Sequence, residues 1–182
     1  MANIVSGNPF IVDAVGILCT KPMHITAVVF NPAAATQEFK CASWNEQATP
    51  TLSLRAAAAS ITGTNTFATT NLITAGAAGA IFKILGSDGA AANLKYSQIA
   101  SITGNDDIVV VGTGLTNEGP LTYALDIYPM IQKIALKAHG TLIEPILFIP
   151  DGGLDVPNLA CGTIGGGIAY IYFTTGAYNA IT

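Results

Sequence analysis

The side chains best suited to metal binding or nucleophilic catalysis are two histidines and three cysteines, and they lie far apart in the sequence. The histidines are His24 and His139, and the cysteines are Cys19, Cys41 and Cys161. Zinc sites need Cys or His at short spacings such as CxxC or HExxH, and the sequence contains neither. We therefore predict no metal site. The cysteines, odd in number and in apolar contexts, are predicted to be buried, reduced thiols of a protein made in a cytosol.

Four aspartates form two close pairs, Asp106 with Asp107 and Asp151 with Asp155. Paired carboxylates can perform general acid–base catalysis or bind calcium. Both pairs lie in sequences of Gly, Asn and Pro, where Asp is favoured because its side chain hydrogen-bonds to the nearby backbone. We interpret all four as turn residues.

The segment 109–118 partly resembles the strand-to-glycine turn of a dinucleotide-binding unit. Asn117 stands where the third glycine should be, and Gly119-Pro120 prevents the helix that should follow. We predict a β-turn here. The chain also lacks the Gly-x-Ser-x-Gly sequence of a nucleophilic serine. The sequence therefore predicts no catalytic, cofactor-binding or metal-binding residue, and a protein that is not an enzyme.

The elements that carry these residues belong to a very apolar chain, with 51% hydrophobic and 10% charged residues. The longest uncharged runs, 56–82 and 156–182, are interrupted by Thr, Asn and Gly, so we expect no membrane-spanning helix and no membrane partner. An outer-membrane barrel is the remaining membrane alternative. The seven Lys and Arg are scattered, which argues against nucleic-acid binding. We expect a subunit whose surface is largely covered by neighbours.

Short runs of β-branched and aromatic residues, ended by turn residues, predict the strands. They lie at 9–19, 23–30, 36–44, 80–85, 108–111 and 121–128, and 145–173 has the same composition. The first three are expected to form a meander. Residues 130–138 fit a helix between Pro129 and Gly140, or a strand with Met130, Ile134, Leu136 and Ala138 on one side; we favour the strand. The fold class is all-β: a jelly-roll-like β-sandwich with its first and last strands adjacent in one core.

The middle of the chain differs in composition, because Thr, Ala, Asn and Gly dominate residues 45–80. We predict a long loop there with a few short strands. The sequence Ala59-Ser-Ile-Thr-Gly63 recurs at 100–104, by duplication or by coincidence. We predict a single sandwich domain, 1–182, with an N-terminal arm at 1–10 and a long Ala/Thr/Gly-rich excursion, an inserted arm or subdomain, at about 45–120. Residues 1–10 and 56–80 are expected to become ordered only on an assembled surface.

Three stretches of the chain resemble small β-sandwich structural proteins of tailed-phage particles, a group that includes capsid decoration, or cement, proteins. They are Ser6-Gly-Asn-Pro9, Lys21-Pro-Met-His-Ile25 with the strand and Asn31-Pro32 turn after it, and 150–172, which resembles a closing hairpin. They cover about half of the chain, mainly its two ends.

The resemblance implies a non-enzymatic protein that decorates or cements a phage capsid without a cofactor. The expected partners are further copies of the chain, as a trimer or dimer, and the major capsid protein or other virion proteins. The expected location is the capsid surface, after assembly in the host cytoplasm. The alternatives are a tail, fibre or adhesin-like module that faces a receptor, and an enzyme or small-ligand module.

Overall fold

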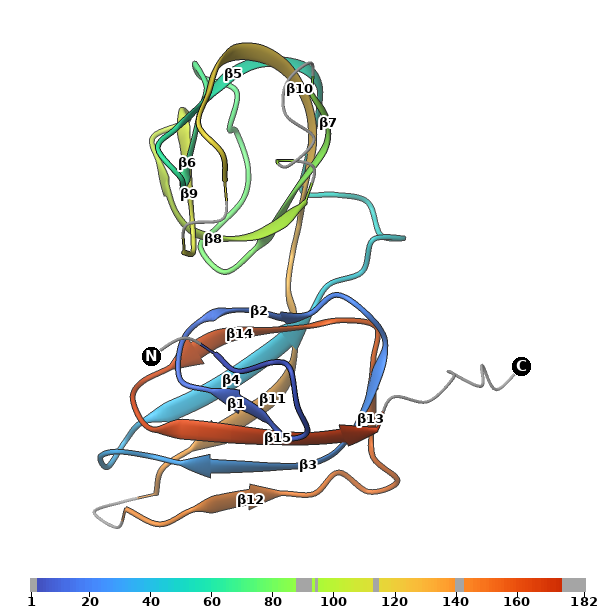
Figure 1. Cartoon of the computed structure of the whole chain (residues 1–182), viewed down its shortest axis with the longest axis vertical. Helices are drawn as coiled ribbons and strands as arrows, with labels where there is room; N and C mark the ends of the chain where they lie inside the picture. The colour runs from blue at the N-terminus through green and yellow to red at the C-terminus, as the bar shows by residue number, and fades with distance from the viewer. Residues whose placement is uncertain (1–2, 88–92, 94, 113–114, 140–142, 175–182) are drawn as a thin grey trace. The chain divides into compact units, whose positions relative to one another are not determined.

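A computed structural model describes residues 3–87, 93, 95–112, 115–139 and 143–174 (Figure 1). The described residues form fifteen β-strands and no α-helix, which confirms the predicted all-β class. The chain divides into two compact units: unit 1 consists of Met1–Ser43 and Ile131–Thr182, and unit 2 of Trp44–Met130. The single domain predicted over 1–182 therefore contains two compact parts, and the insertion predicted at about 45–120 falls within unit 2.

The first sheet of unit 1, sheet I, contains both the first and the last strand of the chain. Its strands follow the order β1 (Phe10–Val12), β15 (Ile168–Thr174), β3 (Met23–Asn31) and β12 (Ile146–Phe148), with β13 (Leu154–Val156) also paired to β3. β1 and β15 are antiparallel, with Phe10 opposite Ile171. The predicted adjacency of the first and last strands is confirmed.

The second sheet of unit 1, sheet II, has the order β11 (Ile131–Lys137), β4 (Glu38–Ser43), β14 (Leu159–Ile164) and β2 (Gly16–Cys19). The strand favoured at 130–138 is confirmed by β11. The predicted opening meander is wrong, because β3 belongs to sheet I and β4 to sheet II. Alternation of apolar and polar residues identifies the buried face of a strand but not the strand beside it.

The inward side chains of the two sheets form one hydrophobic core. Phe30 of sheet I stacks on Phe39 of sheet II, with ring centroids 5.7 Å apart, and both side chains are fully buried. Burying a side chain of this size contributes about 1.5–3 kcal/mol. This core holds together two stretches of chain that are separated by all of unit 2.

Three consecutive glycines, Gly165 to Gly167, carry the chain from sheet II to sheet I. The closing hairpin expected for 150–172 is wrong, because β14 and β15 lie in different sheets and do not pair. Gly167 has a φ of +98°, and a Cβ atom there would lie 2.2 Å from the carbonyl oxygen of Asn31. A side chain is therefore excluded at this crossing by both conformation and space.

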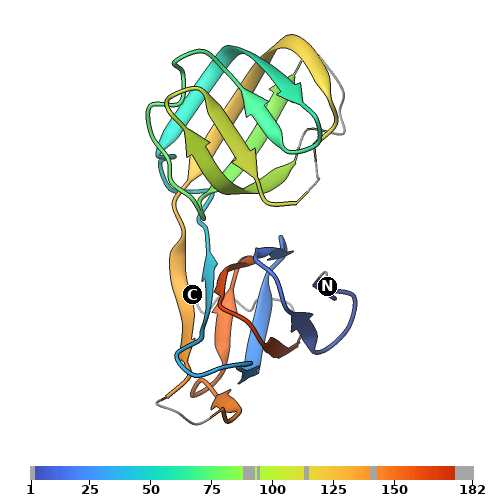
Figure 2. The ribbon, with the colours of Figure 1, turned by 90° about the vertical axis from the view of Figure 1, so that its left-hand side faces the viewer.

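Unit 2 is a closed six-stranded barrel (Figures 1 and 2). The strand order is β10 (Glu118–Tyr128), β5 (Leu52–Thr62), β6 (Thr66–Ala68), β9 (Asp107–Val110), β8 (Tyr96–Thr103) and β7 (Ile81–Ser87), and β7 closes on β10. Side chains fill the interior: the ring of Phe67 lies 5.1 Å from those of Phe82 and Tyr123.

The loop predicted at 45–80 is wrong, because β5 alone is a strand of 11 residues. Ile61, Phe67 and Ile73 are buried in the barrel core. These apolar residues are separated by small Thr, Ser, Gly and Ala residues, which lowered the strand signal of the sequence. In the structure, residues 56–80 are therefore part of a packed barrel rather than an extended arm.

The two copies of the sequence Ala-Ser-Ile-Thr-Gly occupy equivalent places in the barrel. They end β5 and β8, and Gly63 and Gly104 have similar φ values of +66° and +59° in the loops to β6 and β9. The strand order also maps onto itself when β5, β6 and β7 are exchanged with β8, β9 and β10. Both observations favour duplication of a three-stranded unit over coincidence.

Candidate interaction surface

An apolar row of five side chains crosses the outer face of sheet I. Strand register aligns Ile4 with Ile11, Ile11 with Tyr170, Tyr170 with Val29, and Val29 with Leu147. Directly opposite residues of antiparallel strands point to the same face, and strands are spaced at 4.7–4.9 Å, so this row is about 19 Å long. We call these five residues the apolar row. Tyr172 and Ala27 form a second apolar pair beside it.

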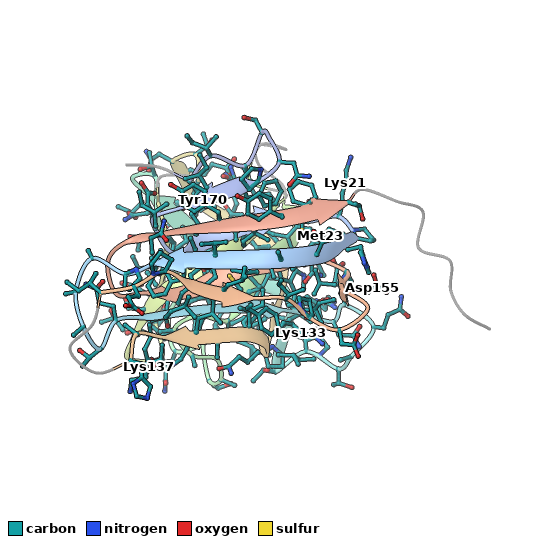
Figure 3. The ribbon with its side chains drawn as sticks, turned by 90° about the horizontal axis from the view of Figure 1, so that it is seen from below. Lys21, Met23, Lys133, Lys137, Asp155 and Tyr170 are labelled. Atoms are coloured by element: carbon teal, nitrogen blue, oxygen red, sulfur yellow. The ribbon has the colours of Figure 1, made fainter. Side chains whose placement is uncertain are left out.

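The row lies on the face away from the core. Its neighbours along each strand are the inward residues, including Phe10, Val28 and Ile171, which are at most 5% exposed. Successive side chains of a strand point to opposite faces, so the residues between these must point outward. In Figure 3, which labels Tyr170, β15 and β3 lie side by side.

Exposure is greatest at the two ends of the row. Leu147 is 61% exposed on β12, the edge strand, and Ile4 is 52% exposed at the other edge. Ile149, which follows β12, is 65% exposed. Contiguous apolar surface of this kind is a mark of an interaction site, whereas single exposed apolar residues are normal.

A polar pair of sheet I lies at the N-terminal end of β3. There the Nδ1 atom of His24 lies 2.6 Å from Oδ1 of Asp155, across the β3–β13 pair. Gly153 makes room for the imidazole, because a Cβ atom on it would lie 2.1 Å from Nε2 of His24. Figure 3 labels Asp155 beside Met23 at this end of the strand. The apolar row is therefore bordered by a hydrogen-bonded pair rather than crossed by charge.

The outer face of sheet II carries a charged cluster, beside the uncharged row Ile17, Ala160 and Ala42. Glu38 and Lys40 of β4 form an ion pair, and Nζ of Lys137 on β11 lies 3.4 Å from Oε1 of Glu38. Hydrogen bonds from Lys40, and then from Lys137, hold the pKa of the Glu38 carboxyl below its usual range. This is the ordinary arrangement for a sheet face in contact with water.

The residues considered in the sequence for catalysis or metal binding do not lie together in the structure. His139 is exposed beyond the end of β11 of sheet II, whereas His24 pairs with Asp155 in sheet I. Asp106 and Asp151 lie in turns, as predicted, but the Asp106 side chain accepts a hydrogen bond at 2.7 Å from the backbone N–H of Asn71 rather than from its own turn. Asp155 was interpreted as a turn residue, but it lies within β13, and Asp107 begins β9.

Where a dinucleotide-binding unit would have a helix, this chain has β10, which begins at Glu118. Residues 113 and 114 of that segment lie outside the described residues. Cys19, Cys41 and Cys161 are free, and Cys41 and Cys161 are buried. Cys19 is only partly buried, so the prediction of burial is wrong for that residue.

Two polar clusters of unit 2 are explained by the barrel itself. Asp126 accepts hydrogen bonds from Ser53 and Tyr128 and pairs with Arg55 at 2.8 Å. Burial raises the pKa of the Asp126 carboxyl, but these donors lower it more, and the net direction is downward. This cluster bridges β5 and β10. In the second cluster, Glu46, Lys83 and Tyr96 hydrogen-bond to one another and join β7 and β8 to the turn before β5.

An apolar pocket of about 370 Å³ lies beside the N-terminal segment of unit 1. Phe10, Met23 and Phe173 line it together with Val5 and Lys21. The adjacent segment is held by its own unit, because the side-chain amide of Asn8 hydrogen-bonds to the carbonyl oxygen of Phe173 at 2.6 Å. The predicted N-terminal arm is thus fastened to sheet I from Asn3 onward.

Within the described residues, no group of three or more His, Cys, Asp and Glu is arranged to hold a metal ion. The described part of the chain also has no helix that could cross a membrane. Comparisons with protein-family models, with curated proteins and with solved structures find no match for this chain.

Sequence reasoning missed the apolar row, although the sequence contains a signal for it. The strands Val28-Val-Phe30, Ile146-Leu-Phe-Ile149 and Ile168-Ala-Tyr-Ile-Tyr-Phe173 are apolar at consecutive positions rather than at alternate ones. Strands that are covered on both faces have such continuous apolar runs. Which side chains align into one row depends on register, and that emerges only from the fold.

Proposed function

We propose that this protein is a non-enzymatic structural protein of a virus particle, which decorates or cements a phage capsid through subunit–subunit contacts. The observation that carries the proposal is the apolar row on sheet I, in a chain with only 10% charged residues. A row of this length left in water would favour association. A shell component needs large, mostly uncharged contacts, and permanent interfaces resemble a domain core cut in half.

The occupant of this face is a second copy of the chain. A partner for the apolar row must itself present an uncharged apolar face, because burying an unpaired charge against it would be costly. A second copy presents that same face, and in a twofold contact the same surface patch of each subunit packs against the other. Homodimer interfaces are also more apolar than other interfaces. We therefore assign a dimer through sheet I, rather than a trimer, as the building unit.

The finer architecture belongs to the same proposal. We propose that unit 1 is a jelly-roll-like β-sandwich; two antiparallel sheets that contribute to one core support the sandwich part of this proposal. Its location is the capsid surface, after assembly in the host cytoplasm, where the reduced state of Cys19, Cys41 and Cys161 would be maintained.

A tail, fibre or adhesin-like module that faces a receptor is the second candidate. The observation that favours it is unit 2, a closed barrel with its own filled core, which could be displayed as an independent receptor-facing module. Copy number separates the two functions, because a cement protein covers the shell whereas a tail module is present in a few copies.

The experiment is quantitative mass spectrometry of purified particles that encode this chain, with the major capsid protein as the internal reference. We expect a copy number of the same order as that of the major capsid protein. A few copies per particle would support the tail candidate and overturn the capsid assignment. Absence of the chain from purified particles would overturn both.

A further inference from the structure

Two of the three cysteines face each other across neighbouring strands of sheet II. Cys41 of β4 and Cys161 of β14 are directly opposite in the antiparallel register, and both have an exposed fraction of 0%. Both are free thiols in the structure. Cys19, on β2, is instead opposite Leu159. The register therefore selects one pair out of the three possible pairs.

The geometry of this pair fits a covalent bond. Directly opposite residues in an antiparallel pair have Cα atoms about 4.5–5.5 Å apart, and disulfides span about 4.4–6.8 Å. The register shifts between Cys161 and Thr163, which leaves Gly162 as an extra residue in β14. A bulge next to Cys161 gives that strand room for the small adjustment that an S–S bond needs.

Burial keeps the two thiols reduced as long as β4 and β14 remain paired. Burial raises the pKa of the Cys41 thiol, and its interaction with the Cys161 thiol raises it further. The thiolate is the form that attacks a disulfide, so reaction in the closed core is slow. Oxidation would therefore follow transient opening of the β4–β14 pair.

We propose that Cys41 and Cys161 form an intramolecular disulfide when the protein meets an oxidising environment that contains a small disulfide such as oxidised glutathione. One protein thiolate attacks the small disulfide, which releases one small thiol and leaves a mixed disulfide. The second protein thiolate then displaces the other small thiol. In total, two protein thiols are oxidised to one disulfide, and one small disulfide is reduced to two thiols.

The bond would join the two separate segments of unit 1. Cys41 belongs to Met1–Ser43 and Cys161 to Ile131–Thr182, and all of unit 2 lies between them in the sequence. At present the core and the backbone pairs of sheets I and II hold these segments together. A disulfide between them closes a long loop, and constraint of the unfolded chain increases with loop length. The oxidised protein should thus unfold at a higher temperature.

The test uses the full chain, incubated with oxidised glutathione or with dithiothreitol, in buffer and in urea below the unfolding transition to permit local opening. Intact mass and non-reducing peptide mapping identify the product. We expect the loss of two hydrogen atoms, a peptide that links Cys41 to Cys161, and a higher unfolding midpoint that dithiothreitol reverses. Cys19→Ser is the matched control and should behave as the natural chain does.

Cys41→Ser and Cys161→Ser should form no such bond and should show no midpoint shift on oxidation. If either variant fails to fold, the peptide map of Cys19→Ser decides the question alone. The proposal is overturned if the thiols stay reduced in both buffers, if only glutathione adducts form, if Cys19 is a partner in the bond, or if oxidation lowers the midpoint.

Discussion

The two outer faces of unit 1 differ although the sheets that carry them share one core. Sheet I presents the apolar row, whereas sheet II presents a cluster in which Glu38 pairs with Lys40 and Lys137, beside a short row of small uncharged side chains. Each sheet already buries its inner face in the common core. The core therefore does not need apolar residues on the outer face of sheet I. The difference supports the proposal that this face serves a contact outside the fold of unit 1.

The barrel of unit 2 differs from both sheets of unit 1 in its strand edges. Its sheet closes on itself, so it has no edge strand within the described barrel, and its apolar side chains Phe67, Phe82 and Tyr123 point inward. Closure removes the unpaired backbone groups that invite strand addition. Sheet I has such an edge at β12, the strand that contains Leu147. The capacity for association is thus expected in unit 1.

The largest expected effect comes from the core that the two sheets share. Phe30→Ala and Phe39→Ala should each lower the free energy of unfolding of unit 1 by about 3–5 kcal/mol, because each leaves a cavity at a fully buried position. The rings contact each other, so the double variant should lose less free energy of unfolding than the sum of the two single variants. Chemical denaturation followed by intrinsic fluorescence and circular dichroism measures this; additive losses would show that the sheets do not share this contact.

A smaller loss is expected at the crossing between the two sheets. Gly167→Ala should destabilise unit 1 by about 2–3 kcal/mol, because the residue has a positive φ and its new Cβ atom would meet the carbonyl oxygen of Asn31. Gly162→Ala is the matched control, since a Cβ atom there meets nothing within 4 Å. Thermal unfolding of both variants measures the difference. Equal midpoints would mean that the crossing tolerates a side chain.

The smallest effect is expected on the charged face. The folded-state pKa of Glu38 is lowered by Lys40 and Lys137, so the folded protein binds fewer protons there than the unfolded chain. The stability that the ionised Glu38 carboxylate adds to the fold is fully present above the unfolded-state pKa of about 4.3. It is lost as the pH falls through the lower folded-state pKa. Glu38→Gln should therefore slightly flatten the acid side of a plot of melting temperature against pH. A steeper acid slope in the variant would contradict the sign of the shift.

The sequence was sufficient to predict the all-β class and several strands, because Met23–Phe30 and Leu121–Tyr128 alternate or cluster in ways that are typical of strands. It was not sufficient to predict which strands pair with one another. β3 and β4 are neighbours in sequence but belong to different sheets, and β1 pairs with β15 from the other end of the chain. Such long-range choices depend on the total packing of the core rather than on local pattern.

The barrel and the apolar row were both missed for physical reasons. In β5, the interior positions Ala59 and Ile61 are surrounded by small Ala, Ser and Thr residues, so a packed strand had the composition of a loop. The apolar row combines residues from 4 to 170, and only Ile4 and Ile11 lie near each other in the sequence. Continuous apolar runs in β3 and β15 were the available signal.

The central claim is that sheet I associates with a second copy, and sedimentation velocity over a range of micromolar concentrations tests it most directly. The natural chain should form a dimer, and Leu147→Asp should weaken it at least about tenfold, because the new carboxylate would be buried against apolar groups. Leu85→Asp is the matched control: Leu85 is 39% exposed on β7 of the barrel, and its variant should dimerise normally. Circular dichroism should show that both variants remain folded. A natural chain that stays monomeric at every concentration, or a Leu147→Asp variant that dimerises as Leu85→Asp does, would contradict the account.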